Sequence, residues 1–170
     1  MGLIKVSDYV ARFLVEHGIH DIFLVSGGGI MHLLDSVGRQ DGLRYWCNYH
    51  EQACAIAAEG YAKHRRSIGA CLVTVGPGGV NALSGVAGAW MDSTPMLVLS
   101  GQVRRDIIAD YRRIRQMGPQ EADVVGMAGP VTKYAVTVMD PGRIRYELDY
   151  ALHQATSGRP GPVWIDLPLD

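Results

Sequence analysis

The feature that most constrains the fold is a series of short apolar segments that alternate with helical patterns along the whole chain. Residues 69–75 (GACLVTV) and 95–100 (PMLVLS) are apolar at nearly every position, which indicates strands buried on both faces. Such strands, separated by helices, are typical of a parallel sheet. We therefore predict an α/β fold, a three-layer sandwich with helices on both faces of a six-stranded parallel sheet. The strands are expected at residues 21–25, 43–48, 69–75, 95–100, 133–138 and 161–167.

Helical patterns fill most of the intervals between these strands. The first has apolar side chains at helical spacing between Val6 and His17, and Gly18 fits its end. Residues 101–118 lack a clear period and are expected to form a mobile loop. The helices are expected at residues 6–17, 30–37, 50–66, 80–91 and 140–158.

Size and charge indicate one ordinary globular domain. The chain has 170 residues, 48% of them hydrophobic, which is enough to bury a core without disulfides. Its net charge of -1 gives no electrostatic reason to expect a nucleic acid partner. The densest cationic stretch, residues 104–115, is interrupted by Asp106 and Asp110. That interruption favours a solvated or substrate-facing loop.

The remaining composition predicts a cytoplasmic protein without a metal site of its own. The three cysteines form no CxxC motif, which is typical of reduced thiols. His17 and His20 lack the additional ligands that a metal ion requires. No apolar run approaches the roughly 18 residues of a membrane helix, and the N-terminus differs from a secretory signal.

Glycine-rich turns follow two of the predicted strands. In parallel sheets, ligands bind beyond the carboxyl ends of the strands. A dinucleotide-binding fingerprint that starts at Gly27 fails at His32, and one that starts at Gly76 fails at Asn81. The chain contains no Gly-Lys pair, which excludes a phosphate-binding P-loop. The glycines therefore indicate turns that let the backbone approach another group closely.

Glu51 stands where a predicted strand meets a helix of small and apolar residues. In an arbitrary protein, a glutamate in the first turn is most simply explained by its favourable interaction with the helix dipole. The surrounding sequence favours a more specific role.

Five segments, in order, resemble the pyrimidine-binding (PYR) domain of thiamine-diphosphate-dependent enzymes. That family includes acetolactate synthase, pyruvate oxidase and benzoylformate decarboxylase. Residues 48–62 resemble its His-Glu-x-x-Ala segment, and residues 74–81 its Thr-Ser-Gly-Pro-Gly-x-x-Asn turn. The resemblance extends from near Val6 to the last residue. The five segments are residues 23–30 (FLVSGGGI), 48–62 (NYHEQACAIAAEGYA), 74–81 (TVGPGGVN), 92–101 (DSTPMLVLSG) and 158–170 (GRPGPVWIDLPLD).

The resemblance implies a role for particular side chains. Glu51 would hydrogen-bond the aminopyrimidine ring and activate the cofactor for attack on a 2-oxo acid substrate. Gln120 would approach the reacting centre. The cofactor-binding residues would be Val25, Ser26, Gly27, Glu51, Pro77 and Asn81. Ser26 stands where proline is usual, Val75 replaces a serine and Pro119 a phenylalanine, so the identity of the 2-oxo acid stays open.

The resemblance also implies partners. The family binds the diphosphate and Mg²⁺ through a Gly-Asp-Gly segment on a second domain, and this chain contains no such segment. Residues 1–170 would be the PYR domain alone, without the central and diphosphate-binding domains. The family completes its site between two chains, so we expect a homodimer or homotetramer and a chain that is inactive by itself. FAD, where required, would be bound by the central domain.

Three hypotheses stay open at this point. The first is the N-terminal domain of a multidomain enzyme of the acetolactate synthase type, which the abrupt ending after Asp170 favours. The second is a stand-alone alpha subunit of a split decarboxylase of the sulfopyruvate decarboxylase type. The third is a non-catalytic nucleotide-binding or regulatory domain, in which Glu51 would have no special role.

Overall fold

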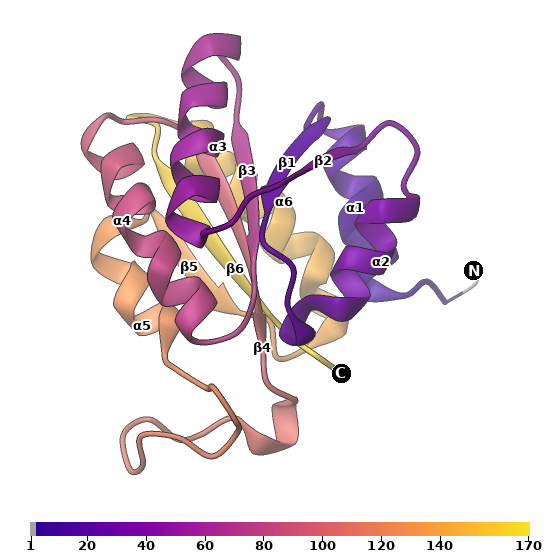
Figure 1. The fold of residues 1–170 in the computed structure, drawn as a ribbon, viewed down its shortest axis with the longest axis vertical. Coiled ribbons are helices and arrows are strands. Elements are labelled where there is room, and N and C mark those ends of the chain that lie inside the picture. The colour runs from indigo at the N-terminus through magenta and orange to yellow at the C-terminus, as the bar shows by residue number, and fades with distance from the viewer. Residues whose placement is uncertain (1–2) are drawn as a thin grey trace.

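The computed structural model describes residues 3–170, which form one parallel sheet between two layers of helices (Figure 1). The strand order is β2-β1-β3-β4-β6-β5, and every neighbouring pair is parallel. The predicted six-stranded, three-layer α/β fold is therefore confirmed. The strands are β1 (Asp21–Leu24), β2 (Arg44–Cys47), β3 (Gly69–Val73), β4 (Met96–Gln102), β5 (Tyr134–Thr137) and β6 (Pro162–Pro168).

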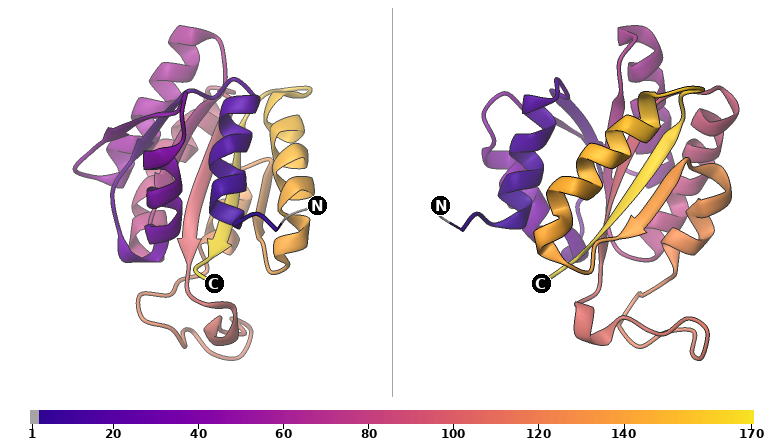
Figure 2. Two further views of the ribbon diagram at one scale, coloured as in Figure 1. Left: turned by 90° about the vertical axis from the view of Figure 1, so that its right-hand side faces the viewer. Right: turned by 180° about the vertical axis from the view of Figure 1, so that it is seen from behind.

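Helices cover both faces of the sheet, as the views in Figure 2 show. Helices α1, α2 and α6 lie on one face, and α3, α4 and α5 on the other. Of the helices in the described part of the chain, none combines the length and apolarity needed to cross a bilayer. The helices are α1 (Val6–Glu16), α2 (Met31–Arg39), α3 (Glu51–Arg65), α4 (Pro77–Met91), α5 (Val124–Ala128) and α6 (Ile144–Thr156).

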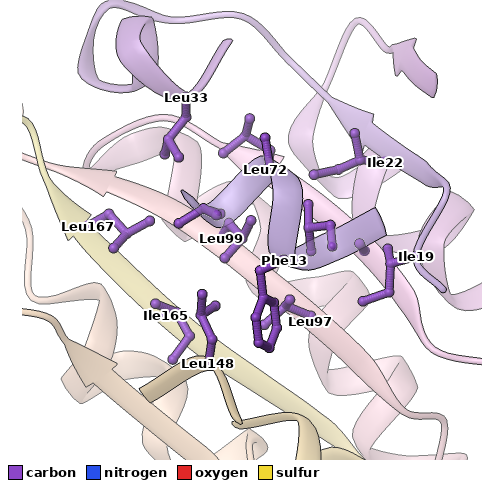
Figure 3. Packing of buried hydrophobic residues seen from close by; sticks show 14 of the residues in the cluster. Phe13, Ile19, Ile22, Leu33, Leu72, Leu97, Leu99, Leu148, Ile165 and Leu167 are labelled. Carbon is purple, nitrogen blue, oxygen red and sulfur yellow. The ribbon is translucent and has the colours of Figure 1, made fainter. Parts of the chain in front are cut away.

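Strand alternation divides the apolar interior into two cores. In β3, Ala70 and Leu72 face α1, α2 and α6, whereas Cys71 and Val73 face α3 and α4. The first core is built from large side chains, as Figure 3 shows for Phe13, Leu72 and Leu99. The second consists largely of alanine, cysteine and valine around Trp164.

Helices α3 and α4 pack against each other through small residues. Ala55 and Ala58 of α3 and Ala82 and Ala89 of α4 are completely buried. A Cβ atom added to Gly85 would lie 2.6 Å from the Cβ of Ala55. The two helices can therefore approach this closely only because these positions carry almost no side chain.

Several element boundaries differ from the sequence-based expectation, and α4 and α5 are the most informative differences. Helix α4 begins at Pro77 rather than at residue 80, because proline at the first helical position needs no N–H partner there. Helix α5 was not predicted, and the Asp123 carboxylate caps it by accepting a hydrogen bond from the Gly126 N–H at 2.8 Å. The segment after β4 contains only the short 3-10 helix η2 (Arg105–Ile107) before α5.

Candidate functional site

The predicted site residues gather at the carboxyl edge of the sheet. Val25 and Ser26 follow β1, Glu51 begins α3 just after β2, and Pro77 begins α4 just after β3. Strand β1 lies between β2 and β3, so the segments that follow these three strands are neighbours. The topology therefore brings together residues that lie up to about 55 positions apart in the chain.

Glu51 and Asn81 are in direct contact. The Asn81 side-chain amide donates a hydrogen bond from Nδ2 to Glu51 Oε2 at 3.0 Å. A Cβ atom on Gly78 would lie 3.3 Å from Glu51 Oε1, so this second oxygen faces a position without a side chain. No protein group within residues 3–170 donates to Oε1. One oxygen is thus fixed, while the other remains available to a ligand.

His50, directly before Glu51, has a structural role in the helix. It is the N-cap of α3, and its Nδ1 accepts a hydrogen bond from the Gln52 N–H at 3.2 Å. This contact satisfies a backbone donor in the first turn and fixes where the helix begins. His50 therefore sets the position of Glu51 on the edge of the sheet.

Thr74 packs beneath the glycine turns and was missed as a site residue. A Cβ atom added to Gly27 would lie 2.5 Å from the Thr74 side chain. A Cβ atom added to Gly78 would lie 2.7 Å from it, and one added to Gly29 would lie 3.1 Å from it. A side chain at any of these glycines would collide with Thr74. The turns after β1 and β3 can therefore meet only because these positions are glycine. The signal that could have identified Thr74 is its place two residues before the Gly-Pro-Gly turn.

The turn at Gly76 brings Gln120 to the same edge. Gly76 has φ +58° and ψ -111°, a conformation that residues with a Cβ rarely adopt. A Cβ at this position would also collide with the carbonyl oxygen of Gln120. Gln120 itself has φ +59°, and its side chain is exposed. The structure thus places Gln120 against the Gly76–Pro77 turn, a proximity that its distance along the chain does not reveal.

These residues form an edge of mixed exposure around the Glu51 carboxylate. Val25 and Glu51 are half-buried, whereas Ser26, Pro77 and Asn81 are exposed. Glycine at positions 27 and 78 lets both turns pack against Thr74, close beside the Glu51 carboxylate. A separate apolar cavity of about 340 Å³ lies behind Gly29 and is lined by Ile30, His32 and Arg105, among others, but by none of the predicted site residues.

A buried carboxyl group supports the sheet below this edge. Asp166 of β6 is completely buried and accepts hydrogen bonds from Ser100 Oγ at 2.5 Å, Thr137 Oγ1 at 3.0 Å and Gln102 Nε2 at 3.1 Å. Trp164 Nε1 donates to Ser100 Oγ at 2.7 Å and extends the network. Removal from water raises the pKa of Asp166 to about 7, although the three hydrogen bonds act in the opposite direction.

We expect Asp166→Asn to change how stability depends on pH. The ordinary pKa of 3.8 applies to the unfolded chain, and the folded value is about 7. Between these pH values the unfolded chain releases the proton while the folded protein keeps it. This group's contribution to the free energy of unfolding therefore falls as the pH rises, by up to about 4 kcal/mol.

The variant has no such group, so its stability relative to the wild type should increase between pH 4.5 and pH 7.5. Denaturant unfolding at the two pH values measures this difference, in which all other titrating groups cancel. Parallel pH profiles for the two proteins would show that Asp166 titrates normally.

Comparisons with known proteins identify relatives along the whole chain. Residues 4–127 match the family model described as "Thiamine pyrophosphate enzyme, N-terminal TPP binding domain". The chain is 39% identical over 170 residues to the acetolactate synthase large subunit of Buchnera aphidicola subsp. Schizaphis graminum. It is 38% identical over 170 residues to the acetolactate synthase isozyme 3 large subunit of Escherichia coli (strain K12).

A third relative also aligns with nearly the whole of this chain through a part of its own length. The chloroplastic acetolactate synthase of Arabidopsis thaliana is 37% identical over 166 residues, which cover 98% of this chain and 24% of that protein. In the Buchnera and Escherichia coli comparisons, the whole chain aligns with 29% of the relative. The chain therefore spans less than a third of the length of the curated relatives it matches.

Proposed function

The chain belongs to the thiamine pyrophosphate enzymes, as an N-terminal TPP-binding domain, and from this membership we propose that it activates the cofactor in an acetolactate synthase-like enzyme that acts on 2-oxo acids. The observation that carries the proposal is the position of Glu51. Asn81 fixes one of its carboxylate oxygens, and the other faces the backbone of Gly78, which carries no side chain.

Each residue of the edge has a simple task in this proposal. Glu51 shares a proton with a ring nitrogen of the aminopyrimidine through Oε1. Asn81 holds the carboxylate in the orientation that this contact requires. The glycine turns at Gly27 and Gly78 bring the backbone close to the ring, and half-buried Val25 offers it an apolar surface. When bound, thiamine diphosphate supplies the nucleophilic carbon and the electron sink for decarboxylation or carboligation of a 2-oxo acid.

Gln120 is assigned to the reacting centre rather than to the pyrimidine. Its exposed side chain begins beside the Gly76–Pro77 turn, at the end of the edge that α4 occupies. A side-chain amide there can donate to a carboxylate or carbonyl oxygen of a 2-oxo acid and orient it.

The complete site requires parts that residues 1–170 do not contain. The diphosphate and its Mg²⁺ are assigned to a diphosphate-binding domain, because this sequence lacks the Gly-Asp-Gly segment. That domain would come from a second chain in a homodimer or homotetramer, so residues 1–170 alone would be inactive. FAD, if the enzyme uses it, would bind to the central domain.

A split enzyme is the alternative, with residues 1–170 as the alpha subunit of a sulfopyruvate decarboxylase-type pair. Both versions assign the same task to Glu51 and differ only in how the diphosphate-binding domain is attached. A non-catalytic nucleotide-binding or regulatory domain is the second alternative. The pairing of Glu51 with Asn81 at the edge of the sheet argues against it.

The proposal is tested on the natural protein that contains this chain. We expect it to bind thiamine diphosphate in the presence of Mg²⁺ and to release CO₂ from a 2-oxo acid only when the cofactor is present. Calorimetric titration with the cofactor and assays with a panel of 2-oxo acids measure both properties. The mass of the native polypeptide separates a multidomain enzyme from a split one. Failure to bind thiamine diphosphate would favour the regulatory alternative.

A further inference from the structure

One buried carboxylate organises the segment between β4 and α5. Glu121 is 6% exposed, and each of its two carboxylate oxygens accepts two hydrogen bonds. Oε1 accepts from the Ala109 N–H at 2.5 Å and from the Tyr111 hydroxyl at 2.9 Å. Oε2 accepts from the N–H groups of Met117 at 2.7 Å and Gly118 at 2.8 Å. The donors come from both ends of the segment of residues 109–118, which forms no regular secondary structure. The Glu121 side chain therefore holds the two ends of this segment together.

These contacts require an ionised carboxylate. Burial alone would raise the pKa of Glu121, but the N–H groups of Ala109, Met117 and Gly118 outweigh it, and the pKa is lowered. A glutamine side chain has only one oxygen. Its amide nitrogen would face two donors and could accept from neither. The segment is therefore sensitive to this change even though glutamine has nearly the same shape.

The segment is also attached to the candidate site. Glu121 directly follows Gln120, whose carbonyl oxygen occupies the space beside Gly76. Gly118 packs closely against Val103. A Cβ atom added to Gly118 would lie only 2.7 Å from a Val103 methyl carbon. The position of Gln120 at the sheet edge thus depends on the same contacts that hold the loop of residues 103–120.

We propose that Glu121 is a positioning residue, which holds the loop of residues 103–120 against the Gly76 turn and thereby fixes Gln120 beside the cofactor edge. The statement about loop order stands on the hydrogen bonds alone. The consequence for catalysis rests on the proposed function.

Loop order is tested by limited proteolysis of the natural protein with trypsin, because the loop carries Arg112, Arg113 and Arg115, all exposed. In Glu121→Gln, cleavage after these arginines should accelerate at least about tenfold, since local opening no longer breaks four hydrogen bonds to a charge. Cleavage at the wild-type rate would overturn the proposal.

Glu147→Gln is the matched control. Glu147 is a buried glutamate that likewise accepts from a tyrosine, Tyr134, and it also accepts from Arg143 Nε at 2.9 Å. None of these residues belongs to the loop. This variant should leave cleavage of the loop unchanged. Acceleration in both variants would mean that general destabilisation, and not Glu121, releases the loop.

The consequence for catalysis is tested by measuring kcat and cofactor affinity of the same variants. In Glu121→Gln, kcat should fall at least about tenfold while the affinity for thiamine diphosphate changes by less than about threefold, because only the Gln120 side of the site moves. A released loop with an unchanged kcat would overturn the catalytic part. A protein that binds no thiamine diphosphate would refute the proposed function, while the proteolysis result would still decide the role of Glu121.

Discussion

Replacing Glu51 with glutamine should lower the turnover of the natural protein by about 10²- to 10⁴-fold, the range lost when a positioned acid–base group is removed. A glutamine side chain keeps the size and the first turn of α3 but cannot share a proton with a ring nitrogen. The Asn81 amide can still donate to its oxygen, so the fold should persist. Steady-state kinetics with a 2-oxo acid measure the loss, and circular dichroism verifies the fold.

Glu59→Gln provides the control for this prediction. Glu59 lies on the same helix two turns later and pairs with Lys63 at 2.7 Å, away from the sheet edge. The same chemical change there should leave turnover within about twofold, because a partly exposed i,i+4 pair contributes little. Equal effects of the two changes, or full activity in Glu51→Gln, would remove the basis for assigning the chemistry to Glu51.

Gly76→Ala should lower the free energy of unfolding by about 3 kcal/mol or more. This is the sum of the cost of a strained backbone conformation and the cost of an overpacked contact. An alanine at φ +58° and ψ -111° is strained, and its Cβ would collide with the Gln120 carbonyl oxygen. The start of α4 and the Gln120 segment would have to separate. Thermal unfolding measures the loss of stability, and kcat should fall with it.

Gly38→Ala separates this effect from the general consequence of removing a glycine. Gly38 lies on α2, and a Cβ there would meet nothing within 4 Å. Alanine in a helix is about 0.5–1 kcal/mol more favourable than glycine, so this variant should be equally or slightly more stable. Wild-type stability in Gly76→Ala would show that the turn tolerates a side chain and can relax.

The fold could be predicted because its strands have an unambiguous pattern. Residues of β3 and β4 are apolar on both faces, which occurs where helices cover a sheet on both sides. The five residues of α5 are too few to show helical periodicity, and its cap at Asp123 was not recognised. The start of α4 was placed three residues late because the Gly-Pro-Gly sequence was interpreted as a turn throughout.

The candidate site could be predicted only in part. Glu51 and Asn81 were identified by their resemblance to a family pattern, and nothing in the spacing of 30 residues indicates their hydrogen bond. Thr74 and Glu121 were missed because their importance comes from tertiary packing. A threonine between glycine turns and a glutamate in a loop look ordinary until the segments around them are brought together.

The small-residue contact between α3 and α4 has a consequence for motion. Alanine and glycine have no rotamers, so a displacement of one helix along the other cannot be absorbed by side chains that change conformation. Gly85 against Ala55 makes such a displacement a collision between backbones. The two helices should therefore fluctuate as one rigid body. Glu51 and Asn81, one on each helix, should therefore keep their hydrogen bond through the thermal motion of the domain, so that a ligand at Glu51 would meet a carboxylate whose orientation is already fixed.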